Sequence, residues 1–121
     1  MPARRQSGPT LYLIDLEAGR PPVHQALANL ERELALAKQE GRILLKLIHG
    51  YGSSGAGGDI RIAVQNRLRE LERNGSIQFC IFGEDWGPSD ANAWKLLKAY
   101  PALKNDPHLG RHNRGITVVL L

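Results

Sequence analysis

The segment 42–48 constrains the fold most, because it is nearly all apolar and runs directly into a glycine-rich loop. A strand with one solvated face alternates apolar and polar residues, whereas a continuous apolar run is typical of a strand that is buried on both faces. Such strands occur in parallel sheets, in which helices connect successive strands and cover the sheet. The sequence therefore predicts an α/β domain made of strand–helix–strand units with right-handed crossovers.

Apolar residues that recur every three or four positions predict helices on either side of this segment. The first such stripe consists of Val23, Leu27, Leu30, Leu34 and Ala37, and Gly41 is expected to end that helix. Strands are expected at 10–16, 42–48, 77–82 and 115–121, and helices at 23–37, 59–74 and 90–100, with Asp59 as the N-cap of the second helix. The predicted fold is a two-layer α/β sandwich with a mixed four-stranded sheet in βαβαβ(α)β order.

The chain of 121 residues is long enough for one domain with one core. Residues 1–9 are basic and polar and are predicted to form a mobile arm, and residues 10–121 the domain, with an inserted helix near 90–100. The single cysteine, Cys80, lies in an apolar run and is expected to be a buried core thiol. The formal net charge of +4 favours an anionic partner.

The sequence shows no sign of a membrane segment. No stretch approaches the roughly 20 apolar residues of a bilayer span, and the basic N-terminus lacks the apolar part of a secretory signal. We therefore expect a cytoplasmic protein with no membrane partner.

The loop 49–58 is the segment in which chemistry is expected. It holds glycines at 50, 52, 55, 57 and 58, and residues 50–55 match the pattern G-x-G-x-x-G between a predicted strand and a predicted helix. Glycines let backbone N–H groups approach an anion closely, and the following helix adds the positive end of its dipole. Arg61, in the first turn of that helix, is expected at the surface, where two parallel hydrogen bonds could hold a phosphate. The alternative is a flexible connector with turn glycines.

Two nucleotide-binding folds fit the loop less well. A P-loop needs Lys followed by Ser or Thr after the glycines, and the residues at that place are Gly57, Gly58 and Asp59, which excludes it. A dinucleotide-binding fold needs an acidic residue at the end of the next strand. Glu84 and Asp85 stand there at long spacing, but a complete strand and helix precede the loop, so this fold is a minor alternative.

The loop Ile48-His49-Gly50-Tyr51-Gly52 and the terminal stretch Gly115-Ile116-Thr117-Val118-Val119-Leu120 resemble the small MutS-related (Smr) domain family. That family shows an H-G-x-G or T-G-x-G loop after its second strand, an early L-D-x-H-type motif and a glycine at the entry to its last strand. The resemblance covers about residues 11–121. It implies an α/β sandwich like the C-terminal domain of a bacterial translation initiation factor. It also implies a domain that binds DNA or RNA, with nicking or endonuclease activity in some members.

Two features depart from the family pattern. The stretch Leu13-Ile14-Asp15-Leu16-Glu17 aligns with the early motif and places Glu17 where many members have His, which argues against cleavage. The inserted helix around Trp94 has no counterpart in the shortest members. Trp86 and Trp94 are expected to close the core over this insertion.

The candidate site consists of the loop and its basic neighbours. The residues expected to bind nucleic acid are Gly50, Tyr51, Gly52, Ser53, Gly55, Arg61 and Arg114. Tyr51 is also a candidate for stacking on a base. A catalytic version would use His49 as general acid or base with Asp15, with a divalent metal ion as its cofactor. In the other interpretation, His49 fixes the loop through hydrogen bonds and there is no cofactor.

No separate metal site is expected, because His24, His108 and His112 show no metal-ligand spacing with any cysteine. Three functions stay open. The first is an Smr-like domain that contacts the phosphate backbone of DNA or RNA, the second a weak DNA or RNA nicking endonuclease, and the third a ribosome-associated or other protein-interaction module.

Overall fold

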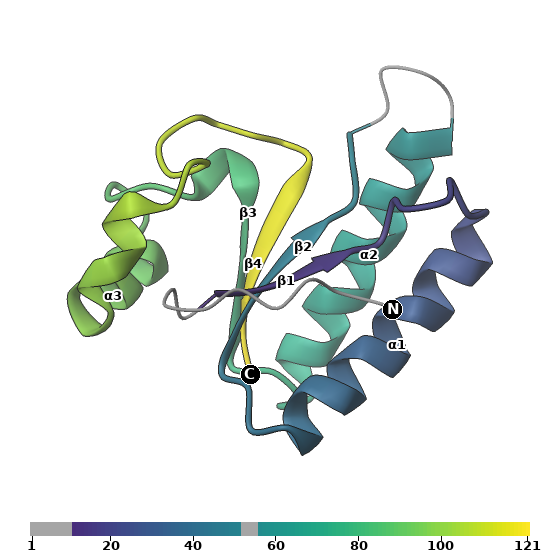
Figure 1. Ribbon diagram of the computed structural model, residues 1–121, viewed down its shortest axis with the longest axis horizontal. Coiled ribbons are helices and arrows are strands. Elements are labelled where there is room, and N and C mark those ends of the chain that lie inside the picture. The colour runs from purple at the N-terminus through teal and green to yellow at the C-terminus, as the bar shows by residue number, and fades with distance from the viewer. Residues whose placement is uncertain (1–10, 52–55) are drawn as a thin grey trace.

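The computed structural model describes residues 11–51 and 56–121 (Figure 1). The predicted basic arm at 1–9 and three of the expected binding residues, Gly52, Ser53 and Gly55, lie outside the described residues. The strands are β1 (Leu11–Asp15), β2 (Leu44–Ile48), β3 (Phe79–Phe82) and β4 (Ile116–Leu120). The helices are α1 (Val23–Gln39), α2 (Ala56–Arg73) and α3 (Ala91–Ala99), with short 3-10 turns η1 (Gly83–Asp85) and η2 (Pro101–Asn105).

The four strands form one mixed sheet in the order β1-β2-β4-β3. β1 pairs with β2 in parallel, and β4 runs antiparallel to both β2 and β3. The α/β class, the mixed four-stranded sheet and the element order predicted from the sequence are therefore confirmed. Because β4 is inserted between β2 and β3, its first residues lie beside the last residues of both neighbours.

The capping residues predicted from the sequence are confirmed for the end of α1 but not for the start of α2. α1 ends as predicted at Gly41, where φ is +75°, and the backbone N–H of Arg42 bonds the carbonyl of Ala37 at 2.9 Å. The prediction that Asp59 is the N-cap of α2 is wrong, because that helix begins at Ala56. Asp59 instead lies in the first turn, where its carboxylate interacts favourably with the positive end of the helix dipole.

α1 and α2 form the helical layer against one face of the sheet (Figure 1). Their buried stripes meet the sheet in an apolar core that includes Leu30, Leu34, Leu45, Val64 and Leu68. The opposite face is covered by the inserted segment, with α3 and η2 (Figure 1). The two-layer sandwich predicted from the sequence is thus the frame of the molecule, and the insertion covers the face that this frame leaves open.

The two tryptophans behave differently. Trp86 is buried in the core under the insertion, as expected, whereas Trp94 is 49% exposed, and its predicted place in the core is wrong. α3 has only nine residues, and its buried positions are Ala93, Leu96 and Leu97, so Trp94 falls on the outer face. There the ammonium of Lys98 lies 4.3 Å from the centre of the indole ring.

Cys80 packs against the core from β3 but stays partly exposed. Its Sγ lies 3.6 Å from Oε1 of Glu72. Burial, together with the Glu72 carboxylate, raises the pKa of the Cys80 thiol to about 12, so the thiol is protonated at neutral pH. The prediction of a buried core thiol therefore holds only in part, because Cys80 lies at the margin of the core rather than inside it.

Within residues 11–51 and 56–121, no helix is long and apolar enough to cross a membrane.

Candidate nucleic-acid interface

The last residues of β1, β2 and β3 and the first residues of β4 meet at one end of the sheet. The register pairs Asp15 with Ile48 and Ile48 with Ile116. The backbone N–H groups of His49 and Gly50 both donate to the carbonyl of Gly115, at 3.0 and 3.1 Å. The glycine-rich loop is thereby attached to the start of β4. Ligands of open α/β sheets gather at this end of the strands, so the topology places the loop where a site is expected.

Gly50 is required at its position by its backbone conformation. Its φ is +72°, a conformation that residues with a Cβ rarely adopt. A Cβ added there would also meet the carboxylate of Glu17, the end of an exposed side chain that can turn away. The glycine of the H-G-x-G pattern therefore has a structural cause in this chain. Glu17, which the resemblance aligns with the His of the early motif, lies directly against the loop.

His49 is fully buried, and both of its ring nitrogens are hydrogen-bonded. Nδ1 lies 2.7 Å from the carbonyl oxygen of Gly50, and Nε2 lies 2.9 Å from Oγ1 of Thr117. Because a carbonyl can only accept, the proton is on Nδ1, and Nε2 accepts from the Thr117 hydroxyl. Burial lowers the pKa of His49 below 6.5, so the ring is neutral at pH 7. In this state His49 fastens the loop to β4.

The structure does not bring the second candidate catalytic residue to His49. Oδ1 of Asp15 accepts from the backbone N–H of Glu17 at 2.9 Å, and the Asp15 side chain is exposed. Among the described residues, the recorded side-chain partners of His49 are Gly50 and Thr117. The arrangement therefore supplies a neutral, positioned imidazole without a carboxylate that orients it.

Arg61 is less exposed than the sequence suggested. The expectation of a surface arginine is wrong, since its side chain is only 17% exposed. It lies in α2, and Nη2 donates to Oε2 of Glu84 at 2.9 Å, which ties α2 to the 3-10 turn after β3. Among the described residues, Arg61 Nε and Glu84 Oε1 are buried without a hydrogen-bond partner. Within the part of the chain that the structure describes, this ion pair therefore leaves one donor and one acceptor unsatisfied, close to the loop.

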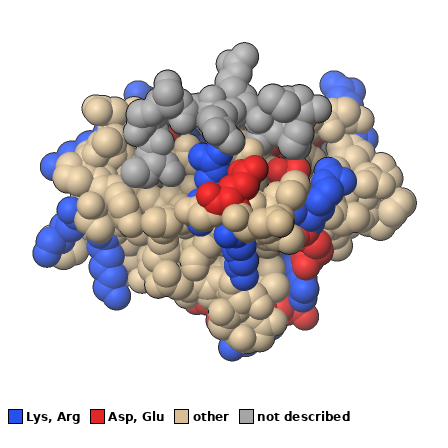
Figure 2. Space-filling view, turned by 60° about the horizontal axis from the view of Figure 1, so that its bottom comes forward, with Lys and Arg blue, Asp and Glu red and all other residues tan. Residues whose placement is uncertain are grey.

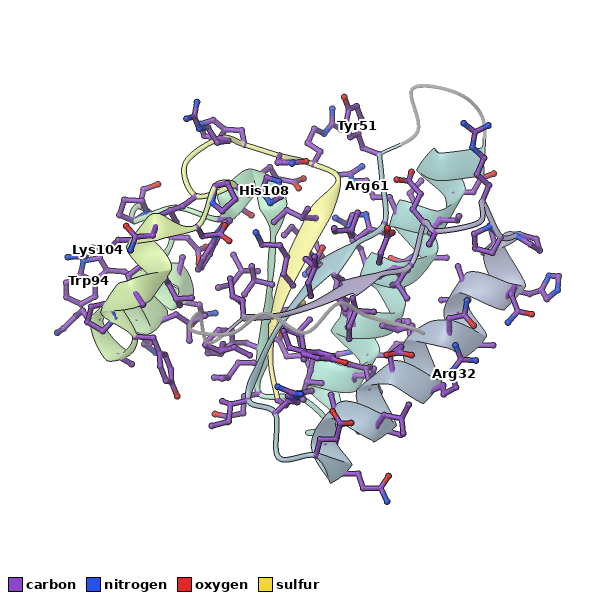
Figure 3. The ribbon with its side chains drawn as sticks, in the orientation of Figure 1. Arg32, Tyr51, Arg61, Trp94, Lys104 and His108 are labelled. Carbon is purple, nitrogen blue, oxygen red and sulfur yellow. The ribbon has the colours of Figure 1, made fainter. Side chains whose placement is uncertain are left out.

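Several side chains at this end of the sheet are exposed. Tyr51 is 56% exposed and points outward above Arg61 in Figure 3. Arg111, His112 and Arg114 are exposed in the turn before β4, and a Cβ on Gly115 would lie 3.3 Å from the ring of Tyr51. The ring of Tyr51 therefore packs against the backbone of Gly115, the residue that follows the exposed Arg114. We name the surface formed by Gly50, Tyr51, Arg61, Arg114 and Gly115 the loop-end surface.

Charge elsewhere on the molecule is mixed. Figure 2 shows Lys and Arg interspersed with Asp and Glu on one further face. Ion pairs such as Arg67 with Glu31, at 2.9 Å, account for part of this mixing. Arg67 of α2 thus lies between the carboxylates of Glu31 and Glu70, whereas Arg69 stacks over the ring of Phe82 at 4.6 Å.

Sequence reasoning missed the two residues that hold the site together. Thr117 is a polar residue inside an apolar strand, and that pattern could have marked it as a partner for a buried polar group. Glu84 was considered only as a nucleotide contact, yet it pairs with Arg61 across 23 residues of sequence. The sequence spacing of Glu84 and Arg61 does not predict this contact.

No protein-family model matches the sequence, and no curated protein matches it. A search of solved structures finds the Smr domain of Thermus thermophilus MutS2, with a TM-score of 0.55, over 90% of this chain and 95% of that one. The chain has the Smr fold. The resemblance read from the loop and the terminal stretch is therefore confirmed at the level of fold, and at 23% identity the match speaks for the fold alone. The residues assigned to the Smr-like site stay predictions.

Proposed function

We propose that this Smr-like domain binds DNA or RNA at the loop-end surface, mainly through the phosphate backbone. The observation that carries the proposal is the exposed ring of Tyr51 packed against Gly115, which directly follows the exposed Arg114, at the end of the sheet where the loop begins. An aromatic ring can stack on any base, and an arginine next to it can pair with the adjoining phosphate. Both contacts are independent of sequence.

Arg61 would join this surface by exchanging partners. Its guanidinium now bonds Glu84, and its Nε is without a partner among the described residues. A phosphate at the loop could accept from Nε and from the amino group that Glu84 now holds, in a bidentate pair. The Glu84 carboxylate would turn toward solvent. Glu84 thus acts as a stand-in anion that keeps the arginine positioned until the ligand arrives.

Cleavage is not part of the proposal. Hydrolysis of a phosphodiester needs an activated nucleophile and a group that protonates the leaving oxygen. His49 is buried, neutral and engaged at both nitrogens, and Asp15 is not bonded to it. Glu17 stands where the early motif of many Smr members has His. An endonuclease at this site would require His49 to leave both partners.

The test is a binding titration with single- and double-stranded DNA and RNA of several sequences, at salt concentrations from 50 to 200 mM. Three arginines at this end, Arg61, Arg111 and Arg114, predict a slope of log affinity against log salt of about −2 to −3 on duplex DNA. Affinity should differ little among sequences. Affinity that stays flat as salt rises would contradict phosphate binding and favour the protein-interaction alternative.

Matched variants locate the site in the same titration. Tyr51→Ala and Arg114→Ala should weaken binding, while Trp94→Ala and Arg32→Ala should not. Trp94 and Arg32 are exposed residues of the same types that lie on α3 and α1, far from Tyr51 (Figure 3). Equal losses of affinity in all four variants would show that nucleic acid does not bind specifically at the loop-end surface.

Gels run on the same samples test cleavage, with and without magnesium or manganese. We expect intact supercoiled DNA and intact structured RNA over a long time course. Robust cleavage by the native protein that disappears in a folded His49→Ala variant would overturn the binding-only proposal and establish the endonuclease alternative.

A further inference from the structure

A cavity of about 270 Å³ lies on the sheet face that α1 and α2 leave open. Its walls are β1, β2 and the segment from η2 to His108. Most of the lining is apolar and includes Leu11, Leu13, Ile48, Leu103 and Pro107. The cavity thus lies between the Smr-like sheet and the inserted segment.

Lys46, Asp106 and His108 line one part of the cavity wall and belong to a largely buried polar cluster. The ammonium of Lys46, on β2, pairs with Oδ1 of Asp106 and lies 2.9 Å from Nδ1 of His108. Asp106 Oδ2 accepts from the indole N–H of Trp86 at 3.0 Å and from the backbone N–H of His108 at 3.1 Å. The side chains of Lys46 and Asp106 are only 5% and 7% exposed. We name Lys46, Trp86, Asp106 and His108 the lysine cluster.

Among the described residues, the hydrogen bonds of this cluster leave one donor of Lys46 without a partner. An ammonium group has three donors, and the recorded partners of Lys46 among the described residues, Asp106 and His108, take two. His108 accepts from Lys46 at Nδ1, so its ring proton is on Nε2. The Asp106 carboxylate, by contrast, already accepts three hydrogen bonds. The cluster can therefore donate to a further group more readily than it can accept from one.

The charge of the cluster restricts what can enter. Lys46 and Asp106 balance each other, and His108 is neutral when it accepts from an ammonium. A charged molecule would be buried here without a counter-ion, which is strongly unfavourable, whereas a neutral molecule with a hydrogen-bond acceptor would satisfy the remaining donor of Lys46. The cavity exceeds the roughly 150 Å³ that holds benzene and lies near the small end of ligand pockets.

We propose that this cavity binds a small, neutral, mainly apolar molecule, of about one ring with a short substituent, whose carbonyl or ether oxygen accepts from the ammonium of Lys46. The apolar walls hold the ring, and Lys46, positioned by Asp106 and His108, sets its orientation. The inserted segment is then the part of the chain that adds a ligand site to the Smr-like frame.

Acetophenone, ethylbenzene and benzoate test the proposal, because they share a ring and differ in the group offered to Lys46. Each is titrated into the protein while the methyl resonances of Leu13 and Ile48 and the indole N–H of Trp86 are followed by NMR. We expect saturable shifts with acetophenone at these resonances. Ethylbenzene, which has no acceptor, should bind about tenfold more weakly. Benzoate should bind at least as weakly as ethylbenzene.

Two variants confirm the location. Ala102 is an exposed residue that lines the cavity, so Ala102→Phe should fill the cavity and abolish the shifts. Ala91 is also exposed but does not line the cavity, so Ala91→Phe should leave the shifts unchanged. If Ala102→Phe does not fold, Leu13→Phe can replace it, because Leu13 lines the same cavity from β1. The absence of saturable acetophenone shifts in the native protein would overturn the proposal. Shifts that survive both filling variants, or tighter binding of benzoate, would do so as well.

Discussion

Strand β2 leads from the lysine cluster to the loop-end surface, yet the polar groups of these two regions are satisfied to different degrees. β2 carries Lys46 into the cluster and leads into His49 and Gly50 at the loop. In the cluster the charges are deeply buried, paired and hydrogen-bonded by a tryptophan and a backbone N–H. At the loop the Arg61–Glu84 pair is part-exposed and leaves Arg61 Nε and Glu84 Oε1 without partners among the described residues.

This difference separates two uses of buried charge. A deeply buried pair that is held by further hydrogen bonds is costly to disturb and fixes the inserted segment to the sheet. A pair with unmet donors and acceptors can change partners at little cost, which suits a surface that receives an anion. We therefore expect changes in the lysine cluster to appear in stability and changes at Arg61 to appear in binding.

The largest effect is expected from Asp106→Ala, which leaves the Lys46 ammonium buried without its counter-ion. Breaking a buried pair in this way costs about 3–5 kcal/mol of unfolding free energy. Urea unfolding measures it. The double variant Lys46→Met with Asp106→Leu, which removes both charges, should recover most of the loss. A loss below about 1 kcal/mol for Asp106→Ala would show that the cluster is not a fastening point.

Arg61→Ala should weaken nucleic-acid binding by roughly 1.5–3 kcal/mol, the value of a hydrogen bond to a charged group. Its far-ultraviolet circular dichroism should match that of the native protein. Glu84→Gln should tighten binding, because it removes the anion that competes for the guanidinium. Arg32→Ala serves as the control at an exposed arginine of α1. Unchanged affinity in a folded Arg61→Ala protein would refute the role assigned to this residue.

Thr117→Val should lower the unfolding free energy by about 1–3 kcal/mol, because it keeps the shape of the side chain and leaves Nε2 of the buried His49 without a donor. Thr117→Ser keeps the hydroxyl and should cost less. Nucleic-acid affinity should stay within about twofold in both. If Thr117→Val were as stable as the native protein, the hydrogen bond to His49 would not be fastening the loop.

The smallest effect is a pH dependence of stability. Burial lowers the pKa of His49 in the folded state, whereas the unfolded chain binds its proton near pH 6.5. The contribution of this residue is therefore complete above pH 6.5 and is lost as the pH falls below that value, with a slope of at most about 1.4 kcal/mol per pH unit. Unfolding in urea from pH 7.5 to 5 should show a shallower loss in His49→Gln than in His24→Gln. Equal slopes in the two variants would contradict the burial of a neutral His49.

The sequence was informative where one local pattern determines the outcome. The apolar run 42–48, the three-and-four spacing of α1 and the glycine loop together predicted the class, the element order and the Smr-like fold. The errors have physical reasons. Asp59 was taken as a cap because capping residues also occur inside first turns. Trp94 was placed in the core because it is apolar, but a nine-residue helix buries only one narrow stripe, and Trp94 lies outside that stripe.

The site depends on contacts that the sequence does not encode locally. His49 meets Thr117 across 68 residues, and Lys46 meets Asp106 across 60. Both contacts arise because β4 and the inserted segment return to β2 after a long excursion. Lys46 and Thr117 are polar residues within apolar strands, and this pattern predicts that each has a buried hydrogen-bond partner. Which residue that partner is can be seen only in the tertiary structure.

The central claim is that the loop-end surface receives a nucleic acid, and amide chemical-shift mapping tests it most directly. A short single-stranded RNA, and the DNA of the same sequence, is titrated into ¹⁵N-labelled protein at low salt. We expect the largest shifts at the backbone amides of Gly50, Tyr51, Arg114 and Gly115 and at the Arg61 Nε–H, with α1 around Arg32 and α3 around Trp94 unmoved. Large shifts on α1 or α3 with these five signals unchanged, or no shifts with any oligonucleotide, would contradict the account.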